Sequence, residues 1–476
     1  MQASKEIWRR IDEKKDQFVA LSDRIWETPE LCYAEAQSCA EHAAVLETEG
    51  FRIERNLVGI PTALAGEAGE GGPVIAILGE YDALPGLSQA AGETSHHPLA
   101  AGGSGHACGH NLLGAASLLA AAALKNHLSE TGLPGRVRYY GCPAEEGGAA
   151  KGFMARDGAF SDVDVAITWH PASFSGVDPA QSLANTRIDF TFLGRASHAA
   201  ASPHLGRSAL DAMELMNVGV NYLREHMPIT ARVHYAILDG GGLAPNVVQA
   251  RAKVRYLIRA ADLGELNSLV GRVRKIAEGA AMMTETRVET AVISAVSNLL
   301  PNAPLEKAMH EVFLGLGPPE WDEADEHLAA KFQAILSEED IAAAYRRHGA
   351  RRQDGKPLCD QILPLGGAGG LAAGVGSTDV GDVSWVVPTV QARGATCAVG
   401  TPFHSWQLTG QGKTSYAHKG MVHVAKVMAA TALAALTDPS LLAEAKTDFA
   451  ERTARTPYVS PLPADAKPAL DMSEGA

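Results

Sequence analysis

Three short apolar runs, each followed by polar residues, dominate the pattern of the first half of the chain. Val74–Leu78, Val137–Tyr140 and Val163–Thr168 have the length and composition of buried strands. Between the first two lies the longest apolar run, residues 112–124, which indicates a buried helix and is too short to span a bilayer. The pattern predicts an α/β fold whose strands deliver their following residues to one edge of a sheet, where open α/β sheets place their sites.

A second pattern occupies residues 187–301. Strands are expected at 187–193, 232–238, 247–258 and 286–293. The first and third are followed by helices with one apolar face, formed by Leu210, Met213, Met216, Val220 and Leu223 and by Leu263, Leu266, Val270, Val273, Ala277 and Ala280. This order, βαββαβ, is ferredoxin-like. We expect it as an inserted unit between two parts of a larger domain, 1–186 and 302–437, with residues 438–476 as a proline-containing tail that is poorly ordered or wraps the surface.

Candidate chemistry follows the predicted strands. The residues are Cys108 and His110 in His-Ala-Cys-Gly-His-Asn, Glu145 and Glu146, His170 in Trp-His-Pro, and His404 in Gly-Thr-Pro-Phe-His. Singly, each has an ordinary structural interpretation, because a lone cysteine is usually a small buried hydrophobe and paired glutamates usually face solvent. Together they match what two close divalent ions need, namely a shared anionic ligand, imidazoles and carboxylates. One further carboxylate must stay off the metals to accept a proton from water, and adjacent glutamates can divide those roles.

The order Cys-x-His, Glu-Glu, Trp-His-Pro and Gly-Thr-Pro-x-His resembles the co-catalytic metallopeptidase family of aminoacylase, carboxypeptidase G and the indole-acetyl-amino-acid hydrolases. The resemblance extends from about the first helix to Leu436. It implies Cys108 as the bridging ligand and Glu145 as general base. The other ligands that it implies are His110, Glu146, His170 and His404.

The resemblance also concerns the segment Glu80-Tyr81-Asp82, which stands where many relatives have His-x-Asp. It implies that Asp82 orients a ligand imidazole from outside the coordination shell. For Glu80 two alternatives stay open. Its carboxylate either binds a metal ion or lies outside the coordination shell.

In the inserted unit, the resemblance implies a lid that also pairs two subunits. His198 would reach the oxyanion in the opposite subunit, and Asn246 and Arg255 would lie near the carboxylate of the substrate. The alternatives are a turn-capping asparagine and a surface arginine. The glycines of residues 367–376 are expected to expose backbone amides to the substrate near Ser377-Thr378-Asp379.

The implied activity is hydrolysis of the amide of an N-acyl or N-aroyl amino acid, with p-aminobenzoyl-glutamate as the leading substrate and two divalent ions, Zn²⁺ or Mn²⁺, as cofactors. Alternatives are another conjugate, such as an indole-acetyl amino acid or a short N-acyl peptide, and a non-catalytic binding relative. The last would be expected to have lost Glu145 or some ligands, and all are present. A Gly-x-Ser-x-Gly elbow and a His-Glu-x-x-His motif do not occur in the sequence.

The amino-acid composition narrows the range of possible partners. Lysine and arginine number 41 against 55 acidic residues, and the formal charge of −14 argues against nucleic acid or an anionic membrane as a partner. Six cysteines without a Cys-x-x-Cys pair suggest neither a disulfide framework nor a zinc ribbon. The charged amino end is unlike a signal peptide. We therefore expect a cytoplasmic protein that acts on a small molecule, as a homodimer or as a heterodimer with a related subunit.

Overall fold

The structure is a computed structural model that describes residues 2–366, 376–454 and 456–473. Its larger part is built around a sheet of seven strands in the order β1-β2-β4-β3-β5-β11-β6. The central pairs β4–β3, β3–β5 and β5–β11 are parallel. The strands are β1 (Arg52–Arg55), β2 (Leu64–Glu70), β3 (Val74–Glu80), β4 (Gly135–Cys142), β5 (Val165–Ala172), β6 (Gly176–Val177) and β11 (Thr389–Ala395).

Both faces of this sheet are buried at β3, which explains why this strand is apolar from Val74 to Leu78. On β3, Ile75 and Ile77 belong to one core cluster, whereas Ala76 and Leu78 belong to another. The helices of the larger part are α1 (Gln2–Glu27), α2 (Ala36–Thr48), α3 (His110–Thr131), α4 (Ala150–Arg156), α7 (Ala303–Leu316), α8 (Glu323–Gln333), α9 (Glu338–His348), α10 (Val380–Ser384), α11 (Trp406–Gln411), α12 (Ser415–Thr437) and α13 (Pro439–Thr453). The expectation of a mixed α/β architecture is confirmed.

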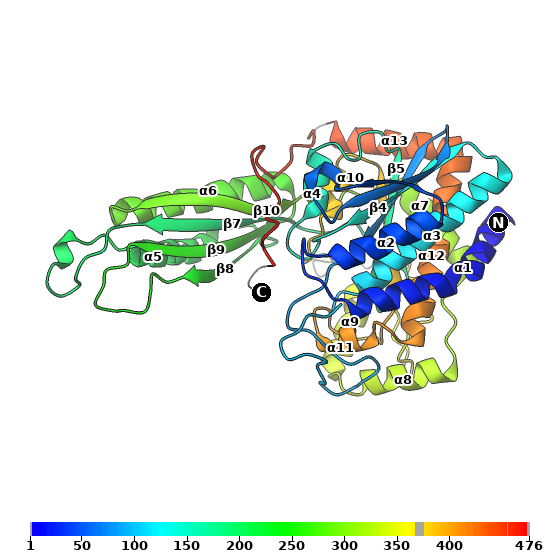
Figure 1. Cartoon of the computed structure of the whole chain (residues 1–476), viewed down its shortest axis with the longest axis horizontal. Coiled ribbons are helices and arrows are strands. Elements are labelled where there is room, and N and C mark those ends of the chain that lie inside the picture. Colours follow the sequence, from blue (N-terminus) through cyan, green and yellow to red (C-terminus); the bar gives the residue numbers. More distant parts are fainter. Residues whose placement is uncertain (1, 367–375, 455, 474–476) are drawn as a thin grey trace.

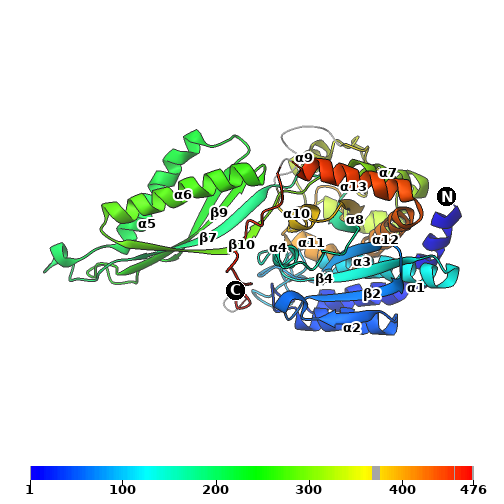
Figure 2. The same ribbon diagram turned by 90° about the horizontal axis from the view of Figure 1, so that it is seen from above.

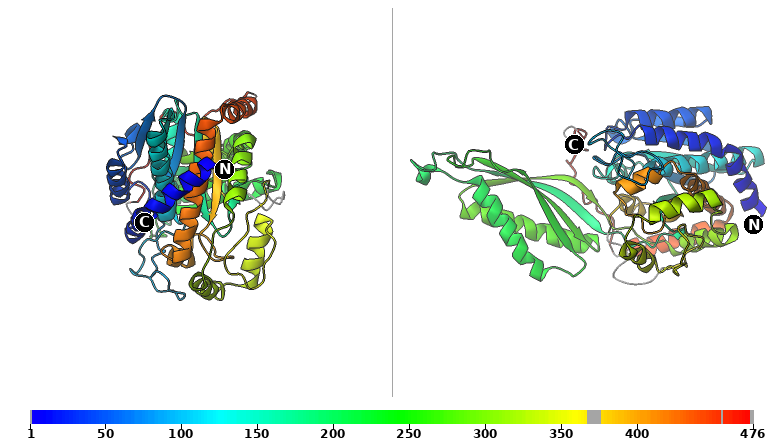
Figure 3. Two further views of the ribbon diagram at one scale, coloured as in Figure 1. Left: turned by 90° about the vertical axis from the view of Figure 1, so that its right-hand side faces the viewer. Right: turned by 90° about the horizontal axis from the view of Figure 1, so that it is seen from below.

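The second unit projects from the larger part along the long axis of the molecule (Figure 1). Its sheet has the order β10-β7-β9-β8, and every pair is antiparallel. The elements are β7 (Ala184–Leu193), α5 (Ala209–Leu223), β8 (Arg232–Asp239), β9 (Arg251–Ala260), α6 (Leu263–Met283) and β10 (Arg287–Val296), in the expected βαββαβ sequence. Both helices lie on one side of the sheet (Figure 3). The first strand begins three residues earlier than the pattern predicted.

One helix of the larger part, α12, is long and apolar enough to cross a membrane. However, 72% of its most apolar window is buried inside the protein, as expected for a core helix. It packs against α1 and α3. Its apolar character is therefore accounted for by the core.

The tail differs from the expectation of an irregular segment, because it begins with helix α13. Asp438 caps this helix by accepting hydrogen bonds from the backbone N–H groups of Ser440 and Leu441, and Pro439 occupies the first turn. The cap at Asp438 and the proline in the first turn therefore start a helix in the tail, although the tail contains several prolines.

Residues 456–473 then follow the surface between the larger part and the projecting unit (Figure 2). The Tyr458 hydroxyl donates to Asp382 Oδ1 at 2.9 Å. The Arg156 guanidinium donates to the carbonyl oxygens of Pro463 and Ala466 at 2.9 and 2.8 Å. Leu462 is buried in the core cluster that also contains Phe153 of α4. The surface wrap is thus a packed part of the fold.

We predict that Leu462→Ala lowers the free energy of unfolding by about 2–5 kcal/mol, because it removes a buried side chain from a packed cluster. The check is a lower Tm by calorimetry. The matched control is Leu470→Ala, since Leu470 is 43% exposed in the same segment. Equal Tm values for both variants would show that residues 456–473 are not held by this contact.

Candidate active site

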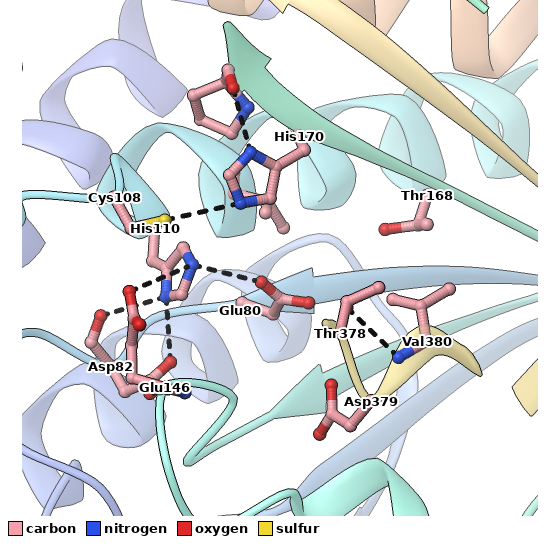
Figure 4. Close-up of polar contacts among 12 residues, drawn as sticks. Glu80, Asp82, Cys108, His110, Glu146, Thr168, His170, Thr378, Asp379 and Val380 are labelled. Atoms are coloured by element: carbon pink, nitrogen blue, oxygen red, sulfur yellow. Dashed lines mark hydrogen bonds and ion pairs between the residues drawn. The ribbon is translucent and has the colours of Figure 1, made fainter. Parts of the chain in front are cut away.

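The ends of β3, β4 and β5 and the first turn of α3 converge at one edge of the large sheet (Figure 4). Among the described residues, three groups of potential metal ligands lie there, and two of them share Cys108. Of these two, one is formed by Cys108, His110 and His170, and the other by Cys108, Glu146 and His404. Within each group the ligand atoms all lie within 4.8 Å of one another. The structure therefore brings together all five side chains singled out as ligands, with Cys108 shared by both groups.

Hydrogen bonds set the orientation of the imidazoles. His110 Nδ1 lies 2.9 Å from Asp82 Oδ1, and since a carboxylate can only accept, this nitrogen carries the proton. His170 Nδ1 likewise donates to the carbonyl oxygen of Pro171 at 2.9 Å. In the neutral form of each ring the Nε2 atom is left with a lone pair, and Nε2 of His170 is 3.4 Å from Cys108 Sγ. This arrangement is typical of metal-binding histidines.

Asp82 has a second function in the site. Its Oδ2 accepts a hydrogen bond of 2.9 Å from the backbone N–H of Glu146. One buried carboxylate therefore fixes both the ring of His110 and the loop that carries the paired glutamates. This geometry supports the expectation that Asp82 orients ligands from outside the coordination shell.

Several polar atoms of the site lack hydrogen-bond partners. Glu80 Oε2, His110 Nε2 and Glu146 Oε1 are buried and unsatisfied, although such atoms are usually paired. His110 Nε2 lies 3.3 Å from Glu80 Oε2 and 3.9 Å from Glu146 Oε1. Lone pairs that face one another in this way are satisfied by cations. The donor set of thiol, imidazole and carboxylate therefore fits divalent metal ions.

The pKa values of the site also indicate that it requires cations. Burial raises the pKa of the Cys108 thiol well above its ordinary value, and the neighbouring carboxylate of Glu146 raises it further. Burial also raises the pKa of Glu145, and the carboxylates of Glu80 and Glu146 add to this effect. Burial lowers the pKa of His170 to about 4, which keeps its ring neutral at pH 7. The site is short of positive charge, and bound cations would allow its acids to ionise.

The loop between β4 and α4 directs the side chains of Glu145 and Glu146 toward different residues. Glu146 Oε2 faces His404 Nε2 at 3.3 Å, whereas Glu145 lies with Glu80 and His110 in a third potential group. His404 enters the site with a left-handed backbone, φ 56°, held by a hydrogen bond from its N–H to the carbonyl oxygen of Ala107. Its side chain is 55% exposed, so the site is open on this side.

The expected substrate residues are not part of these groups. His198 and Asn246 lie together on the projecting unit, where the N–H of Ala199 donates to the carbonyl oxygen of Asn246. Their segments are at the end of the unit far from the larger part (Figure 1). Arg255, on β9, forms a paired hydrogen bond with Asp189 of β7, at 2.6 and 3.0 Å. The glycine-rich segment 367–375 lies outside the described residues.

The sequence did not lead us to expect Lys151, Arg187 or the ion pair of Asp379 near the site. Lys151 and Asp379 form a buried ion pair that also includes Glu80. Arg187, at the start of β7, donates to the carbonyl oxygen of Gly147 in the glutamate loop at 3.1 Å. The one available signal was a lysine inside the short apolar helix Ala150–Arg156.

Comparison with known proteins agrees with this geometry. Residues 76–352 match peptidase family M20/M25/M40. Along 97% of its length the chain is 46% identical to one of the two subunits of the p-aminobenzoyl-glutamate hydrolase of Escherichia coli, and it covers 99% of that protein. The chain belongs to peptidase family M20/M25/M40. As a member of this family it is a metal-dependent amidohydrolase.

Two further proteins are similar to the chain. Xaa-Arg dipeptidase of Mus musculus is 29% identical, and the match covers 92% of this chain and 90% of that protein. The crystal structure of a dinuclear metal binding M20 peptidase from Bacillus subtilis has a TM-score of 0.57 and 18% identity, covering 89% of this chain and 99% of the other. The structural likeness concerns the fold.

We predict that Cys108→Ser loses at least one metal ion and nearly all turnover, because a serine hydroxyl ionises poorly and cannot serve two ions as a thiolate does. Elemental analysis of the purified variant gives the metal content. A suitable control is Cys397→Ser, a buried cysteine beside Ser173 that belongs to none of the three ligand groups. Full metal content and activity in Cys108→Ser would make Cys108 a structural thiol.

Proposed function

We propose that this protein hydrolyses p-aminobenzoyl-glutamate to p-aminobenzoate and glutamate with the help of two divalent ions, Zn²⁺ or Mn²⁺. The observation that carries the proposal is the pair of three-residue groups that share Cys108, with Glu145 beside them. Each of these groups offers three protein ligands, which would leave a coordination position of a bound ion free, as in catalytic zinc sites. The 46% identity to the p-aminobenzoyl-glutamate hydrolase of Escherichia coli supports the choice of substrate.

The chemistry then divides between the two glutamates. The ions supply Lewis acidity, which polarises the amide carbonyl and makes a water molecule more acidic. Glu145 accepts the proton of that water as it attacks the amide and returns the proton to the departing amine. Glu146 holds its place among the ligands through its backbone bond to Asp82. No covalent bond to the protein is required.

His198 is suited to stabilise an oxyanion. Its Nδ1 accepts hydrogen bonds from the backbone N–H groups of Ala200 and Ala201, at 3.2 and 3.1 Å. The proton of the neutral ring therefore resides on Nε2, which becomes an exposed donor. Because its segment lies at the far end of the projecting unit, we propose that it acts in the site of a partner protomer.

An edge of the projecting unit supports the proposal of a partner. β8 is one of the two edge strands of its sheet, and Tyr235, Ile237 and Leu238 on it are 41%, 54% and 46% exposed. Exposed apolar residues on an edge strand usually mark an interface. We propose that β8 meets a second copy of the chain or a related protein. The Escherichia coli relative, itself named as one of two related subunits, supports either choice.

The projecting unit would supply further contacts with the substrate. We propose that Asn246 and Arg255 lie near the carboxylate of the glutamyl group. Asp189 bonds the Arg255 guanidinium through both carboxylate oxygens, so this arginine has a fixed orientation. We also propose a cytoplasmic location, which is supported by six free cysteines.

A second candidate is hydrolysis of other N-acyl amino acids or dipeptides. The likeness to Xaa-Arg dipeptidase favours a test with dipeptides, and indole-acetyl amino acids belong in the same panel. A purely binding role is disfavoured, since Glu145 and all five candidate ligands are present.

We predict that Glu145→Gln keeps its metal and its fold while kcat on p-aminobenzoyl-glutamate falls by ~10²–10⁴, because an amide cannot carry the proton. Glu146→Gln should instead lose metal. Release of p-aminobenzoate and elemental analysis measure the two effects, with each variant serving as the control for the other. Equal metal loss in both would contradict the division of roles.

The proposal of a shared site predicts complementation between protomers. His198→Ala and Glu145→Ala proteins should each be nearly inactive, but mixing them under exchange of protomers should restore roughly a quarter of wild-type activity, because about half the dimers are then hybrids with one intact site. Native mass spectrometry verifies the exchange. Hybrids without activity would place His198 in the site of its own chain.

A further inference from the structure

Lys151 is a fully buried lysine beside the metal-binding residues. Its ammonium lies 2.7 Å from Glu80 Oε1 and 2.6 Å from Asp379 Oδ1, and its side chain is 0% exposed. A buried ammonium is stable only when it is paired, and two carboxylates provide the pairing. The proposed reaction assigns this residue no role.

The position of Glu80 shows why the pairing matters. Its Oε1 is bound by Lys151, but its Oε2 is buried without a hydrogen-bond partner and lies 3.3 Å from His110 Nε2. Glu80, His110 and Glu145 form the third group of potential ligands. Figure 4 shows Glu80 between His110 and Asp379. Without restraint, this carboxylate is close enough to join the coordination of an ion held by His110.

Lys151 itself is held in place. The backbone N–H of Lys151 donates to Asp379 Oδ2 at 2.9 Å, while the ammonium binds the other oxygen of the same carboxylate. The next residue, Gly152, packs so closely that a Cβ there would lie 3.2 Å from the carbonyl oxygen of Ala295. Asp379 therefore anchors both the backbone and the ammonium of Lys151, which opposes movement of the ammonium toward the metals.

We propose that Lys151 is a positioning residue that holds the carboxylate of Glu80 back from the metal ions and so keeps a coordination position open for water and substrate. Catalytic metal sites require such an open position, whereas an additional carboxylate ligand would close it. This inference rests on the proposed function. Of the two alternatives for Glu80, it selects a place outside the coordination shell.

The test uses Lys151→Met, which keeps the length of the side chain and removes its charge. The freed Glu80 should become a ligand, so the variant should keep both ions, release them to a chelator no faster than the wild type, and lose kcat by about 10–100-fold. Adding Glu80→Gln should restore at least tenfold of the lost kcat, because an amide is a poor ligand. Such a rescue would show that the effects of Lys151 and Glu80 on kcat are coupled.

A matched control is Lys446→Met, which removes a half-exposed lysine that is paired with Asp164 on the surface. It should change neither kcat nor the release of metal. If Lys151 were only structural, Lys151→Met would lower the metal content, or Glu80→Gln would not rescue the lost kcat. Either result would overturn the proposal.

If Lys151→Met does not fold, a second measurement still tests the proposal. Glu80→Gln alone should retain both ions, and loss of an ion from it would identify Glu80 as a ligand and refute the proposal. Wild-type protein that binds two ions but cleaves none of the N-acyl amino acids would refute the proposed function instead. The metal content and chelator release of the Lys151 and Glu80 variants would still decide the role of Lys151.

Discussion

The concentration of buried acidic groups at one edge of the large sheet constrains the rest of the structure. Glu80 ends β3 and Asp82 follows it, Glu145 and Glu146 follow β4, and the Cys108 thiol lies just before α3. Such a cluster cannot ionise in a low-dielectric interior without compensating positive charge. Two divalent ions meet this need, and Lys151 compensates the charge at the rear of the site.

The same edge connects the site to the rest of the molecule. The loop with the glutamates runs into α4, whose Lys151 binds Asp379 just before α10, and Asp382 of α10 accepts hydrogen bonds from Ser297 and Tyr458. These contacts reach from the glutamate loop to the end of the projecting unit and to residues 456–473. The glutamate loop is therefore positioned by segments that are distant in sequence.

Much of the fold could be predicted from the sequence because its signals are local. Apolar runs such as Val74–Leu78 identify buried strands, and the polar residues after them mark the sheet edge. Cys108 and His110 are two residues apart and adjoin a long buried helix, so their proximity was evident. Helix α13 was missed because the prolines that follow it, such as Pro461, Pro463 and Pro468, outweighed the capping signal at Asp438.

The contacts that were missed join residues far apart in the chain. Lys151 and Asp379 are separated by 228 positions, and nothing in the sequence pairs them. The bond between Arg255 and Asp189 depends on the register of β7 and β9, which a sequence pattern does not fix. Pairing of charges across a fold is a property of tertiary structure, whereas periodicity is a property of the local chain.

We propose that two ions share the sulfur of Cys108. Anomalous diffraction at the zinc edge from crystals of the zinc-loaded protein is the decisive experiment. Two peaks are expected, roughly 3.5–4 Å apart and each at about 2.3 Å from Cys108 Sγ. A single peak, or two peaks with Cys108 bound to neither, would contradict it.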